Sequence, residues 1–568
     1  MSEEKVKGKS KAAKPADLKD ALKKETAVKK TAGIEKKPAA DLTVLKKAAV
    51  KDTAVKKTVG KKAEGEKVVT VKKTAALSVQ KSAEKNIDKK QAEKTVKSSA
   101  PEKRKILIAA GECCPFIATG GLGEVIGSLP KSVAKVSGFD VRVFLPLYSD
   151  ILAEYRKKMS FVGSIKVQLS WRSQYCGVFL IEENNIKYYF IDNEYYFKRS
   201  GIYGHFDDGE RFAFFSKSIF EAMSFLNFFP DVVHCNDWQT ALIPIYLKAI
   251  YSQWFSYKNI KTIFTIHNIE YQGKYSMDII EDVFGISKSF ARYLEYDGLI
   301  NLVKGAIQCA DKISTVSPTY AKEILSPYFS HGLDRVLELN KGKITGILNG
   351  IDVESYNPLT DTALFANYDA ENIQNKAINK RELQKMLALP PNDNVPILSF
   401  ISRLVPHKGL DLIKCVIEDL LQQKMQIVIL GKGDTVYENY FLDLQKIFSD
   451  KVRAVISYNN DLARKIYAGS DIFLMPSKSE PCGLSQMIAS RYGAVPIVRQ
   501  TGGLLDSITD ENGFTFNNYN AHEMLEKIKH ALHFYEDKPK WQELVKKVMR
   551  ADFSWDKSAK EYIKLYGK

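Results

Sequence analysis

The residues best suited to chemistry include a basic pair in the second half of the chain. Arg403 and Lys408 stand in SRLVPHKGLDLI (Ser402–Ile413), after a predicted strand and before a predicted helix. A guanidinium and an ammonium placed there can hold a diphosphate leaving group as its bond breaks, without a metal. An isolated Arg-x-x-x-x-Lys is more often a solvated basic loop, so this interpretation depends on the motifs around it.

A carboxylate, Glu480, lies in SKSEPCGLSQMIASRYG, after the apolar run DIFLMP. Because that run predicts a buried strand, a carboxylate at its end is well placed to accept hydrogen bonds from sugar hydroxyls. The backbone amides of Cys482, Gly483 and Leu484 can donate to the same sugar ring. Cys482 could instead be a nucleophile, but no base is indicated near it, and a small packed thiol is the more typical role.

Two glycine-rich loops each precede a predicted helix, ATGGLGEVIGSLP from Ala118 and TGGLLDSI from Thr501. Glycines at a helix start let backbone N–H groups approach an anion, and the helix dipole favours negative charge there. One such loop in each half of the chain suits a phosphate-bearing ligand between them. The first loop could also be a plain turn or a dinucleotide fingerprint, but its glycine spacing is one residue off and no acid ends the next strand.

Polar side chains follow two further predicted strands, in HCNDWQTA and FTIHNIEYQGK. Asp237 and His267 come at the strand ends, and Asn268, Tyr271 and Gln272 add amides and a ring on which a sugar can stack. A lone histidine at a strand end is more often a core residue than a catalytic one. No Asp-x-Asp pair or histidine cluster demands a metal, so the sequence predicts no metal site and no cofactor.

The elements that must position these residues are two series of strands and helices. Apolar runs alternate with helical patterns, first in KILIAAGE, VRVFLPLY, DVVHC, TIFTIHN and KISTVS, and then in PILSFIS, QIVIL, RAVIS, DIFLMP and VPIV. This alternation predicts an α/β protein with two doubly wound, Rossmann-like parallel sheets, each covered on both faces. Ligands bind at the carboxyl ends of such strands, which would face a cleft between the two domains.

The first fifth of the chain differs in composition from the remainder. Residues 1–105 hold 31 Lys or Arg and 14 Asp or Glu, which accounts for the whole formal charge of +17, while the remainder has 53 of each sign. No aromatic residue precedes Phe116, so this segment cannot bury enough apolar surface to offset chain entropy, and we expect disorder. A basic tail can bind polyanions such as nucleic acid, but it has no aromatic side chains to stack bases, and a solubilising or tethering role is the alternative.

The predicted boundaries are a disordered basic tail in residues 1–103, an N-terminal Rossmann-like domain in 104–350 and a C-terminal Rossmann-like domain in 351–548. Residues 549–568 are expected to form a helix that packs back on the N-terminal domain. Seven cysteines without paired metal spacing are typical of a reducing cytoplasm. No apolar stretch approaches the roughly 20 residues that span a bilayer, and the start of the sequence does not resemble a secretory signal.

The ordered set of motifs resembles the glycogen and starch synthases, which are retaining glycosyltransferases of the two-domain GT-B fold. The resemblance runs from about Lys105 to Lys568 and rests on TGGL, HxxDWxTA, HNxxYQG, TVSPTYAKEI, GILNGID, SRLxxxKG, EPCGL and a second TGGL. It implies transfer of glucose with retention from ADP-glucose, the usual donor of the family, to the non-reducing end of an α-1,4-glucan such as glycogen or starch. The sequence itself does not distinguish ADP-glucose from UDP-glucose.

The resemblance also implies that residues 104–350 are the acceptor domain and residues 351–548 the nucleotide-sugar domain of a bacterial cytoplasmic enzyme, and it assigns roles to residues. The implied catalytic residues are Glu480, Asp237, His267, Arg403 and Lys408. Implied donor contacts, besides those of Arg403, Lys408 and Glu480, come from Thr119, Gly120, Gly121, Tyr458 on the base, Cys482, Gly483, Leu484, Thr501, Gly502 and Gly503. The acceptor sugar would meet Asn268, Tyr271 and Gln272. In the family's front-face substitution the leaving phosphate helps take the acceptor proton, so neither a covalent nucleophile nor a metal is required.

Two departures from the family pattern concern the first glycine loop. Ala118 stands where the family usually has a lysine, and Glu124 replaces the usual aspartate. Loss of a cation near the donor phosphates or acceptor can weaken transition-state stabilisation. The alternatives to a catalyst of this type are therefore a non-catalytic or weakly active glucan-binding relative, and a different nucleotide-sugar transferase of the same architecture.

Overall fold

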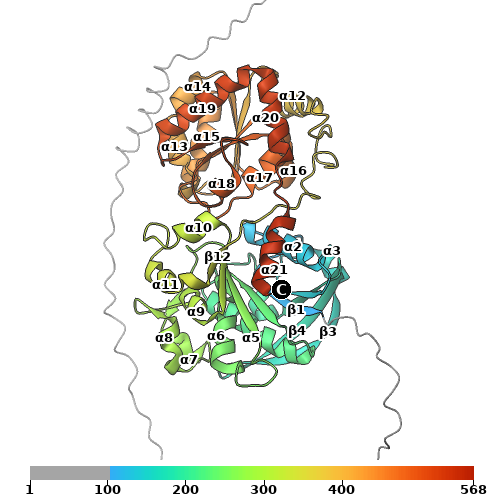
Figure 1. The fold of residues 1–568 in the computed structure, drawn as a ribbon, viewed down its shortest axis with the longest axis vertical. Helices are drawn as coiled ribbons and strands as arrows, with labels where there is room; N and C mark the ends of the chain where they lie inside the picture. Colours follow the sequence, from blue (N-terminus) through green and yellow to red (C-terminus); the bar gives the residue numbers. More distant parts are fainter. Residues whose placement is uncertain (1–102, 568) are drawn as a thin grey trace, which may run out of the picture. The chain divides into compact units, whose positions relative to one another are not determined.

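The structure is a computed structural model that describes residues 103–567, and this part of the chain holds two parallel sheets with helices on both faces (Figure 1). The predicted disorder of residues 1–103 and the polyanion contact of that tail concern residues that lie almost wholly outside the described part. No helix among residues 103–567 is long and apolar enough to cross a membrane.

The N lobe, residues 104–350, is built on a nine-stranded sheet of order β12-β11-β7-β6-β1-β2-β5-β4-β3. Its central strand β1 is parallel to both neighbours, with Ile106 opposite Val141 of β2 and Val232 of β6. The strands are β1 (Arg104–Ala109), β2 (Phe139–Pro146), β3 (Ser160–Leu169), β4 (Arg172–Glu183), β5 (Ile186–Asp192), β6 (Val232–Asn236), β7 (Lys261–Ile266), β11 (Lys312–Thr315) and β12 (Ile344–Gly346).

One edge of this sheet is antiparallel, which the sequence reasoning did not predict. Strand β4 runs antiparallel to both β3 and β5. The β4–β5 turn is formed by Asn184 and Asn185, both with positive φ (53° and 62°), the conformation that two-residue hairpins favour. Asparagine tolerates this conformation better than most residues, so this dipeptide is the local signal for the hairpin.

Helices cover both faces of the nine-stranded sheet, and a small three-stranded sheet lies beside them. The N-lobe helices are α2 (Gly121–Ala134), α3 (Ala153–Lys158), α4 (Glu194–Phe197), α5 (Asp208–Phe225), α6 (Leu242–Tyr246), α7 (Ile279–Asp282), α8 (Ala291–Leu294), α9 (Leu302–Cys309), α10 (Pro318–Glu323) and α11 (Asp334–Leu339). The small sheet pairs β8 (Lys274–Ser276), β10 (Leu299–Asn301) and β9 (Glu295–Tyr296).

The C lobe, residues 351–550, contains a wholly parallel six-stranded sheet of order β15-β14-β13-β16-β17-β18. Its strands are β13 (Ile397–Ile401), β14 (Gln426–Leu430), β15 (Val452–Val455), β16 (Ile472–Met475), β17 (Val495–Arg499) and β18 (Phe514–Phe516). Its helices are α12 (Asn375–Met386), α13 (Leu410–Cys415), α14 (Ile417–Gln422), α15 (Thr435–Ile447), α16 (Asn460–Gly469), α17 (Ser485–Arg491), α18 (Gly502–Ser507), α19 (Ala521–Glu536) and α20 (Lys538–Arg550).

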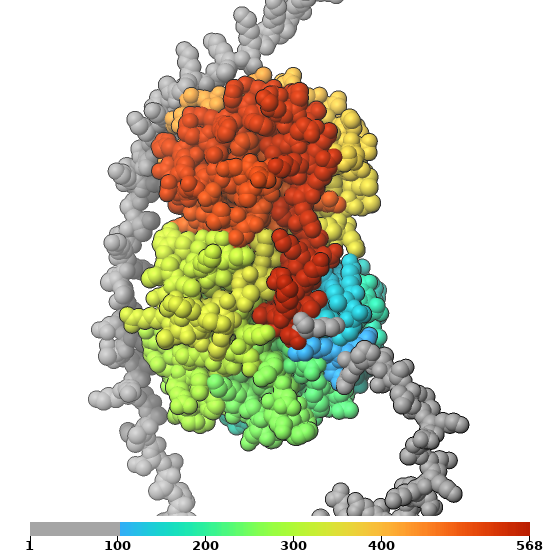
Figure 2. Space-filling view, in the orientation of Figure 1, coloured from blue at the N-terminus to red at the C-terminus, as the bar shows by residue number. Residues whose placement is uncertain are grey.

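After α20 the chain returns to the N lobe as α21 (Trp555–Tyr566), which packs beside α2 (Figure 1). In Figure 2 these dark red residues lie against the blue residues of the N lobe. The Tyr566 hydroxyl lies 2.9 Å from Nδ1 of the buried His234 in β6, and Lys312 Nζ donates to the Leu565 carbonyl at 2.6 Å. The end of the chain is therefore part of the N-lobe core.

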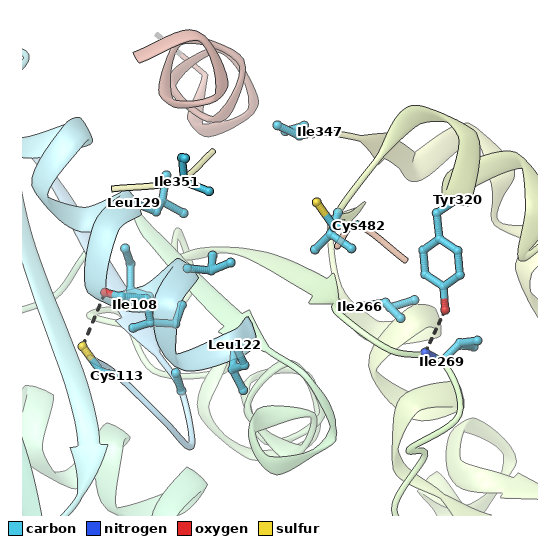
Figure 3. Packing of buried hydrophobic residues seen from close by; sticks show 14 of the residues in the cluster. Ile108, Cys113, Leu122, Leu129, Ile266, Ile269, Tyr320, Ile347, Ile351 and Cys482 are labelled. Atoms are coloured by element: carbon cyan, nitrogen blue, oxygen red, sulfur yellow. Dashed lines mark hydrogen bonds between the residues drawn. The ribbon is translucent and has the colours of Figure 1, made fainter. Parts of the chain in front are cut away.

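The core runs continuously from one lobe into the other, because buried apolar residues of both lobes belong to one contact cluster. Figure 3 shows part of it: Cys482 of the C lobe lies near Ile266 and Tyr320 of the N lobe. Burial of strand residues such as Ile106, Ile108 and Ile472, each wholly inaccessible, supplies the apolar area that stabilises this arrangement. The core thereby fixes the strand ends that carry polar residues.

Candidate active site

A cavity of about 2340 Å³ lies between the carboxyl ends of the two sheets and is lined by residues of both lobes. From the N lobe it is lined by the first glycine loop, the ends of β6 and β7, and the loop that follows β7. From the C lobe it is lined by the segments that follow β13, β14, β15 and β16. The predicted site residues that line it are Thr119, Gly120, Gly121, Asp237, His267, Asn268, Tyr271, Gln272, Arg403, Lys408, Tyr458, Glu480, Cys482, Gly483 and Leu484.

Lys408 and Glu480 form an ion pair in this cavity. Lys408 Nζ lies 2.7 Å from Glu480 Oε2, which also accepts a hydrogen bond from Ser477 Oγ at 3.0 Å. Both charged side chains are largely buried, with 14% and 8% of their surface exposed. The low dielectric of such a place strengthens the attraction, and removal of either partner would leave a buried charge unpaired.

Glycine at position 409 brings Lys408 to this place. Gly409 has φ 79°, and a Cβ there would lie only 2.2 Å from the Pro476 carbonyl oxygen, just after β16. The turn that carries Lys408 can therefore approach the end of β16, where Glu480 follows, only because residue 409 has no side chain. The glycine that follows Lys408 in the motif is therefore required by this close backbone contact.

Arg403 lines the cavity with an exposed side chain, at the start of the same loop. The next residue, Leu404, pairs with Gly433 in a parallel bridge, which joins the loop after β13 to the loop after β14. A Cβ at Gly431 would lie 2.0 Å from the Ser402 carbonyl oxygen, and one at Gly433 would lie 2.3 Å from that of Leu404. The Gly-Lys-Gly turn lines the cavity and was missed by the sequence analysis, although two glycines after the buried run QIVIL were a usable signal.

Asp237 occupies a strained backbone position at the end of β6. Its φ is 56° and its ψ is −178°, a region that residues other than glycine rarely adopt. Its Oδ1 accepts hydrogen bonds from the backbone amides of His267 at 2.7 Å and Asn268 at 3.4 Å. Burial raises the pKa of Asp237 to about 7, against the lowering effect of these two amides.

His267 is a buried, neutral imidazole whose tautomer is set by Asn236. Its Nε2 lies 2.9 Å from Asn236 Oδ1, and Asn236 Nδ2 donates to the carbonyls of Ala109 and His234. Because the amide orientation is set by those carbonyls, Nε2 of His267 is the protonated nitrogen and Nδ1 carries the lone pair. Burial lowers the pKa of His267 to about 3, so the ring is uncharged at neutral pH.

The first glycine loop is anchored by a buried carboxylate that the sequence analysis did not single out. Glu112 is 4% exposed and accepts hydrogen bonds from the Thr119 amide and hydroxyl and from Tyr203 Oη at 2.8 Å. Ala118 also lines the cavity and is partly exposed, so a longer side chain there could reach into it. The available signal was a carboxylate shortly after the buried strand β1.

Glu124, the other departure in the loop, joins the N lobe to the C lobe. Its Oε1 accepts a hydrogen bond from Tyr356 Oη at 3.4 Å, and the Arg464 guanidinium lies 4.8 Å from the Tyr356 ring centre. Burial raises the pKa of Glu124. This longer carboxylate therefore spans the junction between α2 and the segment that leads into the C lobe.

The second glycine loop does not line the cavity. Thr501 Oγ1 and the Gly502 amide both donate to Glu323 Oε1, at 2.9 and 3.0 Å, and the Gly503 amide donates to the carbonyls of Glu480 and Pro481. These donors are occupied by protein groups. The structure therefore places Thr501, Gly502 and Gly503 behind the Glu480 turn, where they support it.

Two other predicted sugar-binding or reactive side chains are constrained by their surroundings. The Gln272 side chain is 4% exposed, donates to the carbonyls of Ile269 and His331, and accepts from Asn301 Nδ2 at 2.7 Å. Burial raises the pKa of the Cys482 thiol to about 12, which favours the packed-thiol interpretation over a nucleophile. By contrast, Tyr458 is 77% exposed at the cavity, free to stack on a ligand.

Comparison with known proteins identifies the family to which this chain belongs. Residues 105–339 match the model of the starch synthase catalytic domain, and residues 382–548 match that of glycosyl transferases group 1. The glycogen synthase of Clostridium acetobutylicum is 50% identical over 476 residues, which cover 81% of this chain and 99% of that protein. The glycogen synthase of Anoxybacillus flavithermus is 46% identical over 471 residues, which cover 81% and 97%.

Solved structures agree with these relatives. The catalytic domain of starch synthase IV from Arabidopsis thaliana, bound to ADP and acarbose, is 34% identical, with a TM-score of 0.76 over 82% of this chain and 99% of that one. The sucrose-phosphate synthase of Thermosynechococcus elongatus, 16% identical with a TM-score of 0.53, shares the fold. The predicted GT-B architecture and family are thereby confirmed, and the chain belongs to the glycogen and starch synthases, as a glycosyltransferase of that type.

Proposed function

We propose that this glycosyltransferase moves glucose with retention from ADP-glucose to the non-reducing end of an α-1,4-glucan. The observation that carries the proposal is the ion pair of Lys408 and Glu480 at the wall of the cavity, with Arg403 on the same loop. A related protein supports this choice of ligands, since the structure of the starch synthase IV catalytic domain is bound to ADP and acarbose. The intact Arg403, Lys408, Glu480 and Asp237 argue against a non-catalytic relative.

The cationic residues hold the donor diphosphate in this proposal. Lys408 touches the carboxylate that orients the hexose, so its ammonium sits at the junction of hexose and diphosphate, where negative charge develops as the bond breaks. Arg403 provides a second, planar cation whose exposed guanidinium can contact the phosphates bidentately. Tyr458 stacks on the adenine, and the Gly431–Gly433 turn, held against the Ser402 and Leu404 carbonyls, lines the same cavity.

The transferred hexose lies between the Glu480 segment of the C lobe and Asp237 and His267 of the N lobe. Glu480 and the amides of Cys482, Gly483 and Leu484 hold the transferred glucose, while Asp237 and His267 face it from the N lobe. A carboxylate at Asp237 stabilises the positive charge of an oxocarbenium-like state, and neutral His267 adds no opposing charge. The leaving diphosphate receives the proton of the acceptor hydroxyl, so the reaction needs no protein nucleophile.

The donor is tested by incubating the protein and glycogen with labelled ADP-glucose or labelled UDP-glucose at equal concentration. We expect label to enter the glucan from ADP-glucose with a higher kcat/KM, and we expect transfer to continue with a chelator present. Preference for UDP-glucose would overturn the donor assignment alone. No incorporation from either donor would overturn the proposed function.

The ionisation of Asp237 predicts a pH dependence of the transfer. Its pKa is raised to about 7, so the carboxylate is the minor form in acid and the major form in mild alkali. If the carboxylate is the working form, kcat/KM for the glucan should rise through pH 7 and level off above it. The Asp237→Asn variant should lose both the rise and most of the activity, and a wild-type rate that falls as pH rises through 7 would contradict this role.

The replacement of a family lysine by Ala118 predicts a gain from Ala118→Lys. The residue lines the cavity and is partly exposed, so the new ammonium can reach the ligand without entering the core. We expect kcat to rise severalfold, measured with ADP-glucose and glycogen. Ala118→Met is the control for side-chain length without charge, and a rate that is unchanged or lowered in the lysine variant would count against a missing cation.

A further inference from the structure

Helix α10 lies where the two lobes meet and contacts the C-lobe helix α18 (Figure 1). It belongs to the TVSPTYAKEI motif, which the proposed function leaves without a role. Its residues contact two segments that line the cavity, the sugar-binding turn Glu480–Gly483 and the acceptor-side loop 268–272.

The first contact is made by Ser317, the residue that caps α10. Ser317 is wholly buried, and its Oγ donates to the Pro481 carbonyl at 2.6 Å. The same oxygen accepts from the Tyr320 amide at 3.2 Å, as an N-cap does. The Ser317 hydroxyl thus caps the N-lobe helix α10 and also holds the backbone of Pro481, the C-lobe residue next to Glu480.

The second contact is reciprocal between α10 and α18. Glu323, at the end of α10, accepts from the Gly502 amide at the start of α18 and from Thr501 Oγ1. Asp506, near the end of α18, accepts from the Thr319 amide at 2.8 Å and from its hydroxyl at 2.7 Å. Each short helix therefore places a carboxylate on unpaired amides at the start of the other.

The first residues of helix α18 pack directly against the backbone of the sugar-binding turn. The Gly503 amide donates to the carbonyls of Glu480 and Pro481 at 3.2 Å. A Cβ at Gly502 would lie 2.0 Å from the Glu480 carbonyl oxygen, and one at Gly503 would lie 2.3 Å from that of Cys482. Because the backbones are in such close contact, a shift of α18 must shift the Glu480 turn.

Helix α10 also holds the acceptor-side loop, through Tyr320. The Ile269 amide donates to Tyr320 Oη at 3.2 Å, a bond drawn in Figure 3. The Ile269 carbonyl accepts from Gln272 Nε2 at 3.0 Å, so the loop is tied to itself at the same residue. Tyr320 is only 1% exposed, which leaves it one well-defined position.

We propose that α10 is a brace that sets the spacing between the acceptor-side loop and the sugar-binding turn, with Ser317 and Glu323 as positioning residues for Glu480. This inference rests on the proposed function, because that proposal makes Glu480 a ligand of the transferred glucose. The donor sugar site is then complete only when an N-lobe helix supports it. The nucleotide contacts of Arg403 and Tyr458 lie on other C-lobe loops, whereas Lys408 contacts Glu480 directly.

The test compares Glu323→Ala, which loses the acceptor of two hydrogen bonds, with Glu323→Gln, which keeps an oxygen at Oε1. Lys322→Ala is the matched control, since Lys322 is exposed on the same helix. We expect Glu323→Ala to lower kcat/KM for ADP-glucose by about 10- to 100-fold, as small displacements of a binding group do. Glu323→Gln and Lys322→Ala should stay near the wild-type value.

Two readouts separate positioning from general loosening of the fold. Calorimetry should give an unchanged Kd for ADP in Glu323→Ala. Hydrogen exchange should be faster in the segments 480–485 and 501–505, and unchanged in 455–459, around Tyr458. Equal losses of ADP and ADP-glucose binding, or normal exchange in 480–485, would overturn the brace. Failure of the wild-type protein to transfer glucose would instead refute the proposed function, while the exchange result would still judge the brace.

Discussion

Replacement of Lys408 by alanine is expected to lower kcat for transfer from ADP-glucose to glycogen by about 10²- to 10³-fold, the cost of removing one preorganised electrostatic group. The ammonium lies 2.7 Å from Glu480 Oε2 at a buried site, so it acts on both the diphosphate and the carboxylate. In the variant, Ser477 Oγ is the remaining described side-chain donor to that oxygen. The measurement is the initial rate of label incorporation at saturating donor.

Lys408→Arg is the matched control, because it keeps a positive charge but not the compact ammonium. We expect it to retain more activity than Lys408→Ala, with kcat still reduced by the altered geometry at Glu480. A Lys408→Ala variant with wild-type kcat would show that the charge beside Glu480 takes no part in departure of the diphosphate.

Glu480→Gln is expected to have the second large effect, a loss of about 10²-fold or more in kcat/KM for ADP-glucose. The amide keeps the shape of the side chain but leaves Lys408 without its carboxylate partner and weakens the hydrogen bonds to hexose hydroxyls. The affinity for ADP should stay near the wild-type value, since Arg403 and Tyr458 line the cavity from other loops. Calorimetry with ADP and rate measurements with ADP-glucose separate these two effects.

Glu526→Gln serves as the control for this substitution, because Glu526 is an exposed carboxylate on α19 of the same lobe. It should leave both measurements unchanged. If Glu480→Gln weakened the binding of ADP and of ADP-glucose to the same extent, the carboxylate would act on the nucleotide. The assignment of the hexose to Glu480 would then fail.

Most of the parallel core was predictable, because buried parallel strands appear in sequence as uninterrupted apolar runs. QIVIL and DIFLMP correspond to β14 and β16, whose residues are buried throughout. Strand β3 gave no such run, because polar and apolar residues alternate in it, with Ile165, Val167 and Leu169 less exposed than their neighbours. The Asn184–Asn185 turn was the clearest local indication of the antiparallel edge.

The roles of charged residues in the candidate site were predictable from sequence, but those of the glycines were less so. Lys408 and Glu480 were identified by charge at strand ends, and the structure brings them into contact. The glycines at 502 and 503 suggested an anion site, but here they permit close contact with the carbonyls of Glu480 and Cys482. Sequence cannot separate these two uses of glycine, because both require only that no Cβ be present.

The central claim is that facing lobes hold a diphosphate at Arg403 and Lys408 while Glu480 orients the hexose. A crystal structure of the protein with ADP-glucose tests it most directly. We predict phosphate oxygens within hydrogen-bonding distance of both cationic side chains and glucose hydroxyls on Glu480. A nucleotide bound elsewhere, or a diphosphate in the cavity that neither Arg403 nor Lys408 contacts, would contradict the account.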